Sequence, residues 1–215
     1  MTTKPRTLLA DDHTLVLEGF KRLIEQRCEV VGTVEDGRAL LEAASRLKPT
    51  VILVDISMPL LNGIDATRQL KTLLPDTKII IVTMHADPAY LNEAFKAGAS
   101  GYLLKRSAGS ELSQAIDTVL AGHYYVTPLL TKDLIQSAMG SASTPIARDP
   151  ELTPRQREVL QLVAEGKTVK EIAHLLNISP KTVEFHKSQI MDQLDLRTTA
   201  ELTKYALTHG LTSPA

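Results

Sequence analysis

The chain contains one cysteine, no tryptophan and few other aromatic residues, and the lone cysteine limits the kinds of site it can build. Cys28 cannot form a disulfide within the chain, and nothing pairs it at a metal-ligand spacing. We interpret Cys28 as a small buried hydrophobic residue at the start of a strand. The sequence therefore predicts neither a disulfide framework nor a cysteine-based metal centre.

Long hydrophobic runs and an excess of either charge are also absent. No apolar run approaches the ~20 residues of a membrane span, and the residues from Met1 to Arg6 lack the apolar core of a signal peptide. Basic and acidic residues number 15 and 16 up to residue 140, and 9 and 9 after it. We expect a cytoplasmic protein with no membrane partner. Any binding of nucleic acid must depend on where the basic residues lie, because the net charge is only −1.

Length and composition predict a globular chain of one large or two ordinary domains. It has 215 residues, 43% of them hydrophobic. The stretch Gly140-Ser141-Ala142-Ser143-Thr144-Pro145 has the small polar composition of a flexible linker, and a short helix is expected near 128–138. We therefore predict a first domain over 1–122, a linker with a short helix over 123–149 and a second domain over 150–215.

The first part alternates short β-branched apolar runs with helical periodicity. This alternation predicts an α/β domain with a doubly wound, five-stranded parallel sheet. The expected strands are 6–10, 29–34, 51–54, 78–83 and 101–104, and the expected helices are 14–26, 37–47, 63–73, 88–97 and 109–121. Gly98 and Gly122 are expected to end the last two helices.

Polar residues stand where four of these strands end. They are Asp11 and Asp12, Asp55, Thr83 and Lys105. Because parallel strands finish at one edge of a sheet, these side chains are expected to meet in one crevice. Loops are polar in general, so one such residue means little, but the full set indicates a site.

The carboxylates of this set predict a bound cation. Crowded carboxylates repel one another unless a cation neutralises them, and oxygen ligands with room for water suit Mg²⁺. We expect Asp12, Asp55 and the backbone carbonyl of Ser57 to bind Mg²⁺ directly, with Asp11 acting through a water. Asp55, alone at the end of the central strand, is the best-placed nucleophile toward phosphorus, and Mg²⁺ and Lys105 would stabilise the phosphoryl oxygens.

Residues 5–122 resemble the receiver domain of bacterial two-component response regulators, which has a flavodoxin-like fold. The resemblance lies in Ala10-Asp11-Asp12-His13, Val54-Asp55-Ile56-Ser57-Met58-Pro59-Leu60-Leu61-Asn62-Gly63, Val82-Thr83-Met84 and Gly98-Ala99-Ser100-Gly101-Tyr102-Leu103-Leu104-Lys105. It implies that Asp55 accepts a phosphoryl group from a sensor histidine kinase, and that Thr83 and Tyr102 are the switch residues. Ser57 and His85 match positions that tune phosphoryl lifetime. Arg106 departs from the family, in which proline often follows the lysine.

From residue 151 onward the pattern is helical throughout. Helices are expected at 154–164, 168–176, 180–194 and 199–209, three of them begun by capping boxes at Thr153/Gln156, Thr168/Glu171 and Thr198/Glu201. The short turn Asn177-Ile178-Ser179 between the middle two helices has helix-turn-helix spacing. The second domain is therefore predicted to be an all-α, four-helix domain.

The third of these helices is predicted to be a recognition helix. Val183, Ile190 and Leu194 form its core face, and Lys181, Thr182, His186 and Lys187 are candidate phosphate contacts. Glu184 is placed to accept from cytosine, and Phe185 to touch a thymine methyl. The whole candidate DNA-contacting set is Thr168, Lys181, Thr182, Glu184, Phe185, His186, Lys187 and Ser188. If charge alone is considered, a small helical interaction domain with a solvated polar face is favoured over a DNA-binding domain.

Residues 150–211 closely resemble the LuxR-type helix-turn-helix, and this resemblance favours DNA binding. It lies in the segments Glu151–Leu160, Ala164–Ala173 and Asn177–His186. Family members bind DNA as dimers that pair through the last helix. The matching stripe is Leu202, Tyr205, Ala206 and His209, part of which must also serve the domain's own core.

A receiver, a linker and a LuxR-type domain together resemble a response regulator of the NarL/FixJ class. The resemblance implies that phosphorylation of Asp55 with Mg²⁺ favours a homodimer on a two-fold related site in double-stranded DNA, with RNA polymerase a candidate further partner. We expect no turnover enzyme. An aspartyl-nucleophile phosphatase would need a second acid where Ser57 stands. A DNA-binding regulator controlled without phosphate is the other alternative, although such proteins usually lose a member of the acidic set.

Overall fold

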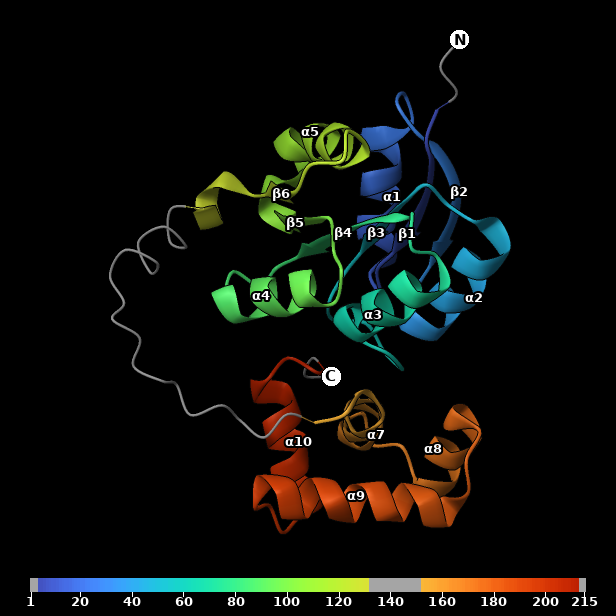
Figure 1. The fold of residues 1–215 in the computed structure, drawn as a ribbon, viewed down its shortest axis with the longest axis vertical. Coiled ribbons are helices and arrows are strands. Elements are labelled where there is room, and N and C mark those ends of the chain that lie inside the picture. The colour runs from blue at the N-terminus through green and yellow to red at the C-terminus, as the bar shows by residue number, and fades with distance from the viewer. Residues whose placement is uncertain (1–3, 132–151, 213–215) are drawn as a thin grey trace. The chain divides into compact units, whose positions relative to one another are not determined.

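The computed structural model describes residues 4–131 and 152–212, which form an N-terminal and a C-terminal domain (Figure 1). Residues 128–131 are helical, in agreement with the start of the short helix expected near 128–138. The rest of that helix and the glycine- and serine-rich stretch lie outside the described residues. Within the described residues, no helix is both long enough and apolar enough to cross a membrane.

The N-terminal domain contains a parallel sheet with the strand order β2-β1-β3-β4-β5-β6. The five longer strands match the prediction: β1 (Arg6–Ala10), β2 (Glu29–Val34), β3 (Val51–Val54), β4 (Lys78–Thr83) and β5 (Gly101–Leu104). Because β1 lies between β2 and β3, the strand order reverses at β1 and β3. An open parallel sheet forms its ligand crevice beside such a reversal, at the carboxyl ends of the strands.

A sixth strand, β6 (Tyr125–Val126), extends the sheet beside β5 and was not predicted. Two backbone hydrogen bonds hold it, from Tyr125 N to Ser100 O at 3.1 Å and from Thr127 N to Tyr102 O at 3.0 Å. A two-residue strand shows no periodicity, so a sequence pattern cannot reveal it.

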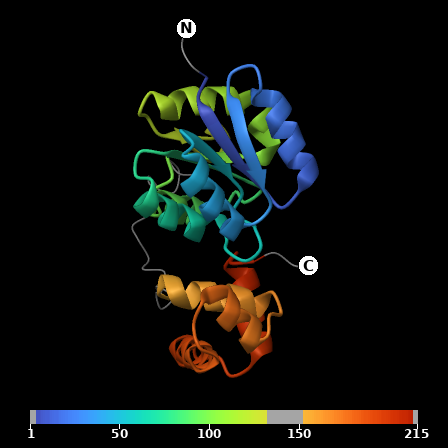
Figure 2. The ribbon, with the colours of Figure 1, turned by 90° about the vertical axis from the view of Figure 1, so that its right-hand side faces the viewer.

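Helices cover both faces of the sheet (Figure 2). One face carries α1 (Thr14–Ile24) and α5 (Ala108–Leu120), and the other carries α2 (Gly37–Leu47), α3 (Gly63–Leu73) and α4 (Pro88–Lys96). Gly98 and Gly122 adopt positive φ angles of 100° and 88° just after α4 and α5, as expected of helix-ending glycines. The predicted doubly wound α/β fold is confirmed.

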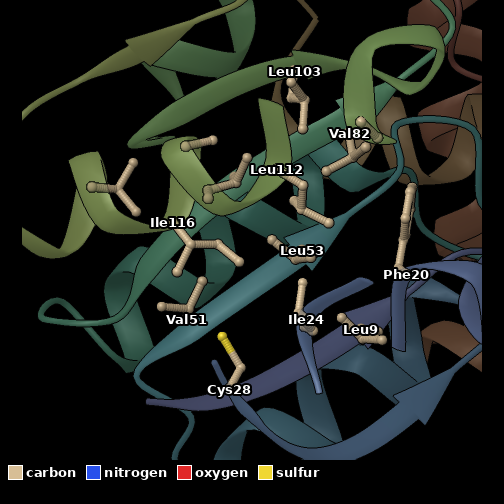
Figure 3. Packing of buried hydrophobic residues seen from close by; sticks show 14 of the residues in the cluster. Leu9, Phe20, Ile24, Cys28, Val51, Leu53, Val82, Leu103, Leu112 and Ile116 are labelled. Carbon is tan, nitrogen blue, oxygen red and sulfur yellow. The ribbon is translucent and has the colours of Figure 1, made fainter. Parts of the chain in front are cut away.

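The core between the sheet and the helices α1 and α5 is built from alternate residues of the strands. Leu9, Leu53 and Val82 point from β1, β3 and β4 toward Ile24 of α1 and Ile116 of α5 (Figure 3). Cys28 is 3% exposed and belongs to the same cluster, so its prediction as a small buried residue is confirmed. This packing fixes the strand ends that carry the polar set.

The C-terminal domain consists of α7 (Pro154–Ala164), α8 (Val169–Leu176), α9 (Pro180–Leu194) and α10 (Thr199–Thr208). All three predicted capping boxes are present, and Ser179 caps α9 by accepting from Thr182 N. Asn177 ends α8 in the left-handed conformation, with φ 51°, which makes the sharp turn into α9. The predicted four-helix organisation is confirmed.

The predicted core face of α9 is also confirmed. Val183 and Ile190 are 0% and 1% exposed, and Leu194 packs against the same cluster while partly buried. They contact the cluster built on α7 and α8, which includes Val159, Leu160, Val163, Ile172 and Leu176. The opposite side of α9 is therefore left for contacts outside the domain core.

Candidate functional site

The ends of β1 and β3 bring Asp11 and Asp55 together. Ala10 pairs with Val54 in the parallel register, so the next residue of each strand enters the same crevice. Asp55 N donates to Ala10 O at 2.9 Å, and Asp11 N donates to Val34 O at 3.1 Å. Both carboxylates are buried, with residue exposures of 1% for Asp11 and 4% for Asp55. Two buried carboxylates at one sheet edge require a counter-charge.

Lys105 supplies that counter-charge from the end of β5. Its Nζ atom lies 2.7 Å from Asp11 Oδ2 and 2.7 Å from Asp55 Oδ2. The other oxygen of Asp55 accepts a hydrogen bond from Ile56 N at 2.7 Å. Arg106, which replaces the proline common in receivers, lies in a single 3₁₀ turn over Lys105–Ser107. Lys105 therefore contacts both carboxylates even though arginine, and not proline, follows it.

Burial and charge shift the pKa values of two groups in this crevice. Burial alone would lower the pKa of Lys105, but the charge of Asp55 and hydrogen bonds to Asp11 and Asp55 outweigh it and raise that pKa. Burial is also the largest effect on Asp11 and raises the pKa of its carboxyl, with the charge of Asp55 adding to it and Lys105 opposing it. One lysine therefore does not fully compensate the carboxylates around it.

The raised pKa of Asp11 predicts a pH-dependent gain in stability from Asp11→Asn in metal-free protein. A carboxyl whose pKa is raised in the folded state stabilises the fold while protonated, and this contribution is lost as pH rises through the folded-state pKa. The uncharged amide should therefore raise the melting temperature at pH 7, and the gain should vanish as pH falls toward the ordinary aspartate value of 3.8. Thermal melts over that range, with Asp12→Asn as control, measure this. A gain independent of pH would contradict it.

The oxygen donors predicted to bind Mg²⁺ suit a hard divalent cation. Asp11 and Asp55 share the crevice, and Asp12 lies at its exposed side with 32% of its side chain exposed. Ser57 follows Asp55 by two residues in the loop between β3 and α3. Carboxylate and carbonyl oxygens next to solvent are the ligands that Mg²⁺ uses while keeping several waters. The residues present therefore fit such an ion.

His85 forms hydrogen bonds with Thr83, Tyr102 and Ser57. The sequence alone did not predict these contacts. Its backbone N donates to Thr83 Oγ1 at 3.3 Å, and its backbone O accepts from the hydroxyl of Tyr102 at 2.9 Å. Its ring Nε2 lies 3.0 Å from Ser57 Oγ, and the ring stacks on Tyr90 with centroids 4.4 Å apart. The loop that follows Thr83 is thus tied to the loop that follows Asp55.

Tyr102 points into the domain rather than into solvent. It is 0% exposed, and burial raises the pKa of its phenol well above the ordinary value, with smaller contributions from Tyr90 and Asp55. A buried phenol remains protonated and needs an acceptor, which the carbonyl of His85 provides. The ring position is therefore coupled to the conformation of the loop after β4.

Gly63 belongs to a segment that carries the receiver resemblance, but sequence reasoning gave it no role in the site. A Cβ atom at this position would lie 1.9 Å from the backbone O of Asp55 and 2.8 Å from its carbonyl C. Only glycine lets the first turn of α3 approach the backbone of Asp55 so closely. The glycine itself is visible in the sequence, but the approach of the Asp55 carbonyl depends on the folded loop.

Gly63→Ala is expected to destabilise the domain by about 1–3 kcal/mol, because the added methyl meets backbone atoms that cannot rotate away. Chemical denaturation measures the loss. The matched control is Gly109→Ala in α5, where a Cβ would meet nothing within 4 Å, so that variant should be neutral or slightly stabilising. Equal effects of the two substitutions would contradict the close approach at Gly63.

Four of the predicted DNA-contacting residues lie on the side of α9 away from its core face: Lys181, Glu184, Phe185 and Ser188 are exposed, Phe185 with 57% of its surface. Thr182, His186 and Lys187 are partly buried, and Lys187, four residues after Val183, lies beside the core face. Single exposed apolar side chains are common on protein surfaces, so the exposure of Phe185 leaves it accessible to a partner without requiring one. The Nδ1 atom of His186 is buried, so only the other ring nitrogen can reach a phosphate.

Thr168 stands apart from this set at the start of α8. Its hydroxyl donates to Glu171 Oε2 at 2.6 Å and accepts from Glu171 N at 3.3 Å. The hydroxyl bond and a second bond to Glu171 Oε2, donated by Thr168 N at 2.7 Å, lower the pKa of the Glu171 carboxyl. The Thr168 side chain is therefore engaged in capping α8, and its contact with DNA remains a prediction.

The predicted dimer stripe on α10 divides into a buried and an accessible part. Leu202 and Ala206 are 0% exposed and belong to the domain core, which the stripe was also expected to serve. Tyr205 and His209 stack with ring centroids 3.8 Å apart and lie nearer the surface, Tyr205 partly buried and His209 exposed. Of the four residues in the predicted stripe, only Tyr205 and His209 are therefore accessible for contact with a second copy of the chain.

Two family models match the two domains in the predicted order. Residues 7–117 match the response regulator receiver domain, and residues 150–206 match the bacterial regulatory proteins of the luxR family. "Transcriptional regulatory protein MctR" of Rhizobium johnstonii is 37% identical, with 99% of each chain covered. "Oxygen regulatory protein NreC" of Staphylococcus epidermidis is 39% identical, with 94% of this chain and 96% of the relative covered.

Solved structures of a response regulator match both domains as well. RcsB of Salmonella typhimurium is 30% identical with a TM-score of 0.66, covering 97% of this chain and 99% of that one. RcsB bound to a promoter in the presence of the phosphomimetic BeF₃⁻ is 31% identical with a TM-score of 0.60, covering 98% and 100%. The chain belongs to the NarL/FixJ-class response regulators, a family of transcription regulators rather than turnover enzymes.

Proposed function

We propose that Asp55 accepts a phosphoryl group from a sensor histidine kinase and that its phosphorylation controls binding of α9 to DNA. The observation that carries the proposal is the buried pair of Asp11 and Asp55, bridged by Lys105 at 2.7 Å on each side. Such a set holds a nucleophilic carboxylate beside a fixed positive charge. An ion pair with a structural role alone would not require three neighbouring acids at the carboxyl end of the sheet.

The transfer is a displacement at phosphorus. A carboxylate oxygen of Asp55 forms the new P–O bond while the P–N bond to the donor imidazole breaks, and the imidazole leaves with the electron pair. Lys105 contacts Asp55 Oδ2 and stands beside the incoming phosphoryl oxygens. Asp11, Asp12, Asp55 and the Ser57 carbonyl would hold Mg²⁺, which supplies positive charge to the phosphoryl oxygens when bound. A small-molecule phosphodonor would undergo the same displacement.

The signal leaves the crevice through the loop after β4. Thr83 ends that strand, and its hydroxyl already accepts from His85 N. A phosphoryl group on Asp55 adds acceptor oxygens to which the Thr83 hydroxyl can donate, so the loop and the ring of Tyr102 have a new preferred arrangement. Tyr102 follows because its hydroxyl is bonded to the His85 carbonyl. We infer a shift of a two-state equilibrium, as in other phosphorylation switches.

The output is a dimer on two-fold related DNA. The exposed side of α9 carries Lys181 for phosphates and Phe185 for a thymine methyl, while its core face is fully used within the domain. Tyr205 and His209 on α10 are the residues proposed to contact the second copy. RNA polymerase is a candidate further partner, and a cytoplasmic location fits this function.

The first test is Mg²⁺-dependent phosphorylation of the full chain by a small phosphodonor. Intact mass should increase by one phosphoryl group with Mg²⁺ and not with chelator, and reductive cleavage should locate the group on Asp55. Asp76→Ala, an exposed aspartate in the turn before β4, is the matched control and should be phosphorylated normally. No phosphorylation under any condition, with folded protein, would favour the phosphate-independent alternative.

A separate prediction concerns Lys181 on the exposed face of α9. Lys181→Ala should weaken DNA binding for every sequence tested and reduce the salt dependence of the affinity by about one phosphate contact. DNA affinity measured over a series of salt concentrations gives both the affinity and its salt dependence. Lys96→Ala, an exposed lysine on α4, should change neither. An unchanged salt slope in Lys181→Ala would remove Lys181 from the interface.

A further inference from the structure

After α5 the chain adds a short segment to the edge of the receiver sheet and then turns into a helix. The strand β6 pairs with β5 (Figure 1), and residues 128–131 are helical. Thr127 stands between these two elements and is 0% exposed. Leu130 is 3% exposed, so the helical residues are packed onto the domain as well. The first residues of the predicted linker are therefore a built part of the receiver domain.

The hydroxyl of Thr127 takes the place of a backbone acceptor in the ladder between β5 and β6. Thr127 N donates to Tyr102 O at 3.0 Å. If the parallel ladder continued, Leu104 N would donate to Thr127 O. Thr127 O instead accepts from Leu130 N at 2.9 Å, and Leu104 N donates to Thr127 Oγ1 at 3.1 Å. Threonine thus lets the strand end and the helix begin while the buried N–H of Leu104 keeps an acceptor.

Both β5 residues that are bonded to Thr127 belong to the candidate site or adjoin it. Tyr102 is the proposed switch aromatic, and its hydroxyl is bonded to the loop after β4. Leu104 directly precedes Lys105, whose Nζ atom lies 2.7 Å from Asp55 Oδ2. Two hydrogen bonds therefore connect the backbone of the site-bearing strand to the residue that starts the helix.

We propose that Thr127 is the output residue of the receiver, whose hydroxyl and backbone N–H carry a rearrangement of β5 into residues 128–131. From there the chain continues to the DNA-binding domain. The inference rests on the proposed function, because phosphorylation of Asp55 is what rearranges β5. A shift of Tyr102 or Leu104 must either move Thr127 or break a buried hydrogen bond, and an unsatisfied buried donor is costly.

The competing interpretation is that β6 only anchors the end of the receiver. Loss of the Thr127 hydroxyl would then lower the melting temperature and leave the effect of phosphorylation on DNA affinity unchanged. The output role predicts loss of that effect in a folded, phosphorylated protein. Stability and coupling are separate measurements, so the two interpretations can be distinguished.

The first test compares Thr127→Val with Thr127→Ser in the full chain. Valine has the shape of threonine without the hydroxyl, whereas serine keeps the acceptor for Leu104 N. With phosphodonor and Mg²⁺, Thr127→Val should still gain the phosphoryl group by intact mass. Its DNA affinity should then rise by less than about twofold, against about 5–150-fold for the parent chain. Thr127→Ser should retain the rise of the parent chain.

Thr131→Val is the matched control, because Thr131 is an exposed threonine of the same helical segment. Its hydroxyl lies 3.4 Å from Thr127 O and does not take part in the ladder with β5. This variant should keep the full rise in DNA affinity. A full rise in phosphorylated Thr127→Val would overturn the proposal. Loss of the rise in Thr127→Ser or Thr131→Val would do the same, since both keep the hydroxyl that accepts from Leu104 N.

A second measurement uses the parent chain and is independent of whether Thr127→Val folds. Amide hydrogen exchange of individual residues is followed by nuclear magnetic resonance, with Mg²⁺ and with or without phosphodonor. Exchange at Leu104 and Leu130 should change by about fivefold or more on phosphorylation, as should exchange at Thr83. A change at Thr83 with unchanged exchange at Leu104 and Leu130 would overturn the output role of Thr127.

Failure of this inference can be told apart from failure of the proposed function. A parent chain that is phosphorylated and gains DNA affinity, with the same gain in Thr127→Val, would reject the role of Thr127 alone. A parent chain that is neither phosphorylated nor gains DNA affinity would reject the proposed function and this inference with it.

Discussion

Asp55→Ala is expected to abolish the increase in DNA affinity that a phosphodonor produces in the parent chain. Coupling between two sites of a protein typically amounts to about 1–3 kcal/mol, so the parent chain should bind its DNA about 5–150-fold more tightly after phosphorylation. The variant loses the carboxylate at the centre of the crevice and the partner of Lys105 Nζ at 2.7 Å. Affinity measured by fluorescence anisotropy, with Mg²⁺ and with or without phosphodonor, gives the ratio.

Asp76→Ala controls for unspecific effects of the phosphodonor and should retain the full ratio. The basal affinity of Asp55→Ala should stay close to that of the unphosphorylated parent chain, because α9 and its core are unchanged by the substitution. A phosphodonor response that survives in folded Asp55→Ala would contradict the role of this aspartate. It would point to another acceptor or to another mode of control.

Tyr205→Asp is expected to reduce affinity for a two-fold related DNA site by about 100-fold or more, while leaving affinity for an isolated half-site unchanged. Two linked recognition helices gain about 10²–10⁴-fold over one through effective concentration. A charge at Tyr205 would break the stack with His209 and place a carboxylate at the proposed dimer contact. Gel shift on full and half-sites, with sedimentation of the DNA-free protein, measures both effects.

Leu207→Asp is the matched control for this experiment. Leu207 lies on the same helix two residues further on, is 38% exposed, and faces away from Tyr205. The substitution Leu207→Asp introduces the same charge and should leave the ratio of full-site to half-site affinity unchanged. Loss of the ratio in Leu207→Asp but not in Tyr205→Asp would move the dimer contact to the other side of α10.

The strand ends were the most predictable part of the molecule. The strands β1, β3, β4 and β5 are runs of mostly buried residues closed by a polar one, and parallel topology then forces Asp11, Asp55 and Lys105 to one edge. Helix starts were equally clear, because Thr153 and Thr168 carry their capping partners three residues on. Both signals are local in sequence, and both were confirmed.

Features that depend on tertiary contacts were not predictable. The stripe of Leu202 and Ala206 has the period of a helix face, but periodicity cannot tell a face covered by the domain's own core from one covered by a second copy. The closeness of Gly63 to Asp55 O arises from a loop path that no residue pattern encodes.

The most direct test of the account measures phosphorylation and DNA affinity on the same samples of the full chain. Samples with increasing occupancy of Asp55, determined by intact mass, are titrated against a site selected from genomic fragments. The account predicts that the fraction of high-affinity protein rises in proportion to the phosphorylated fraction. Full phosphorylation of Asp55 with unchanged affinity for the selected site would contradict it.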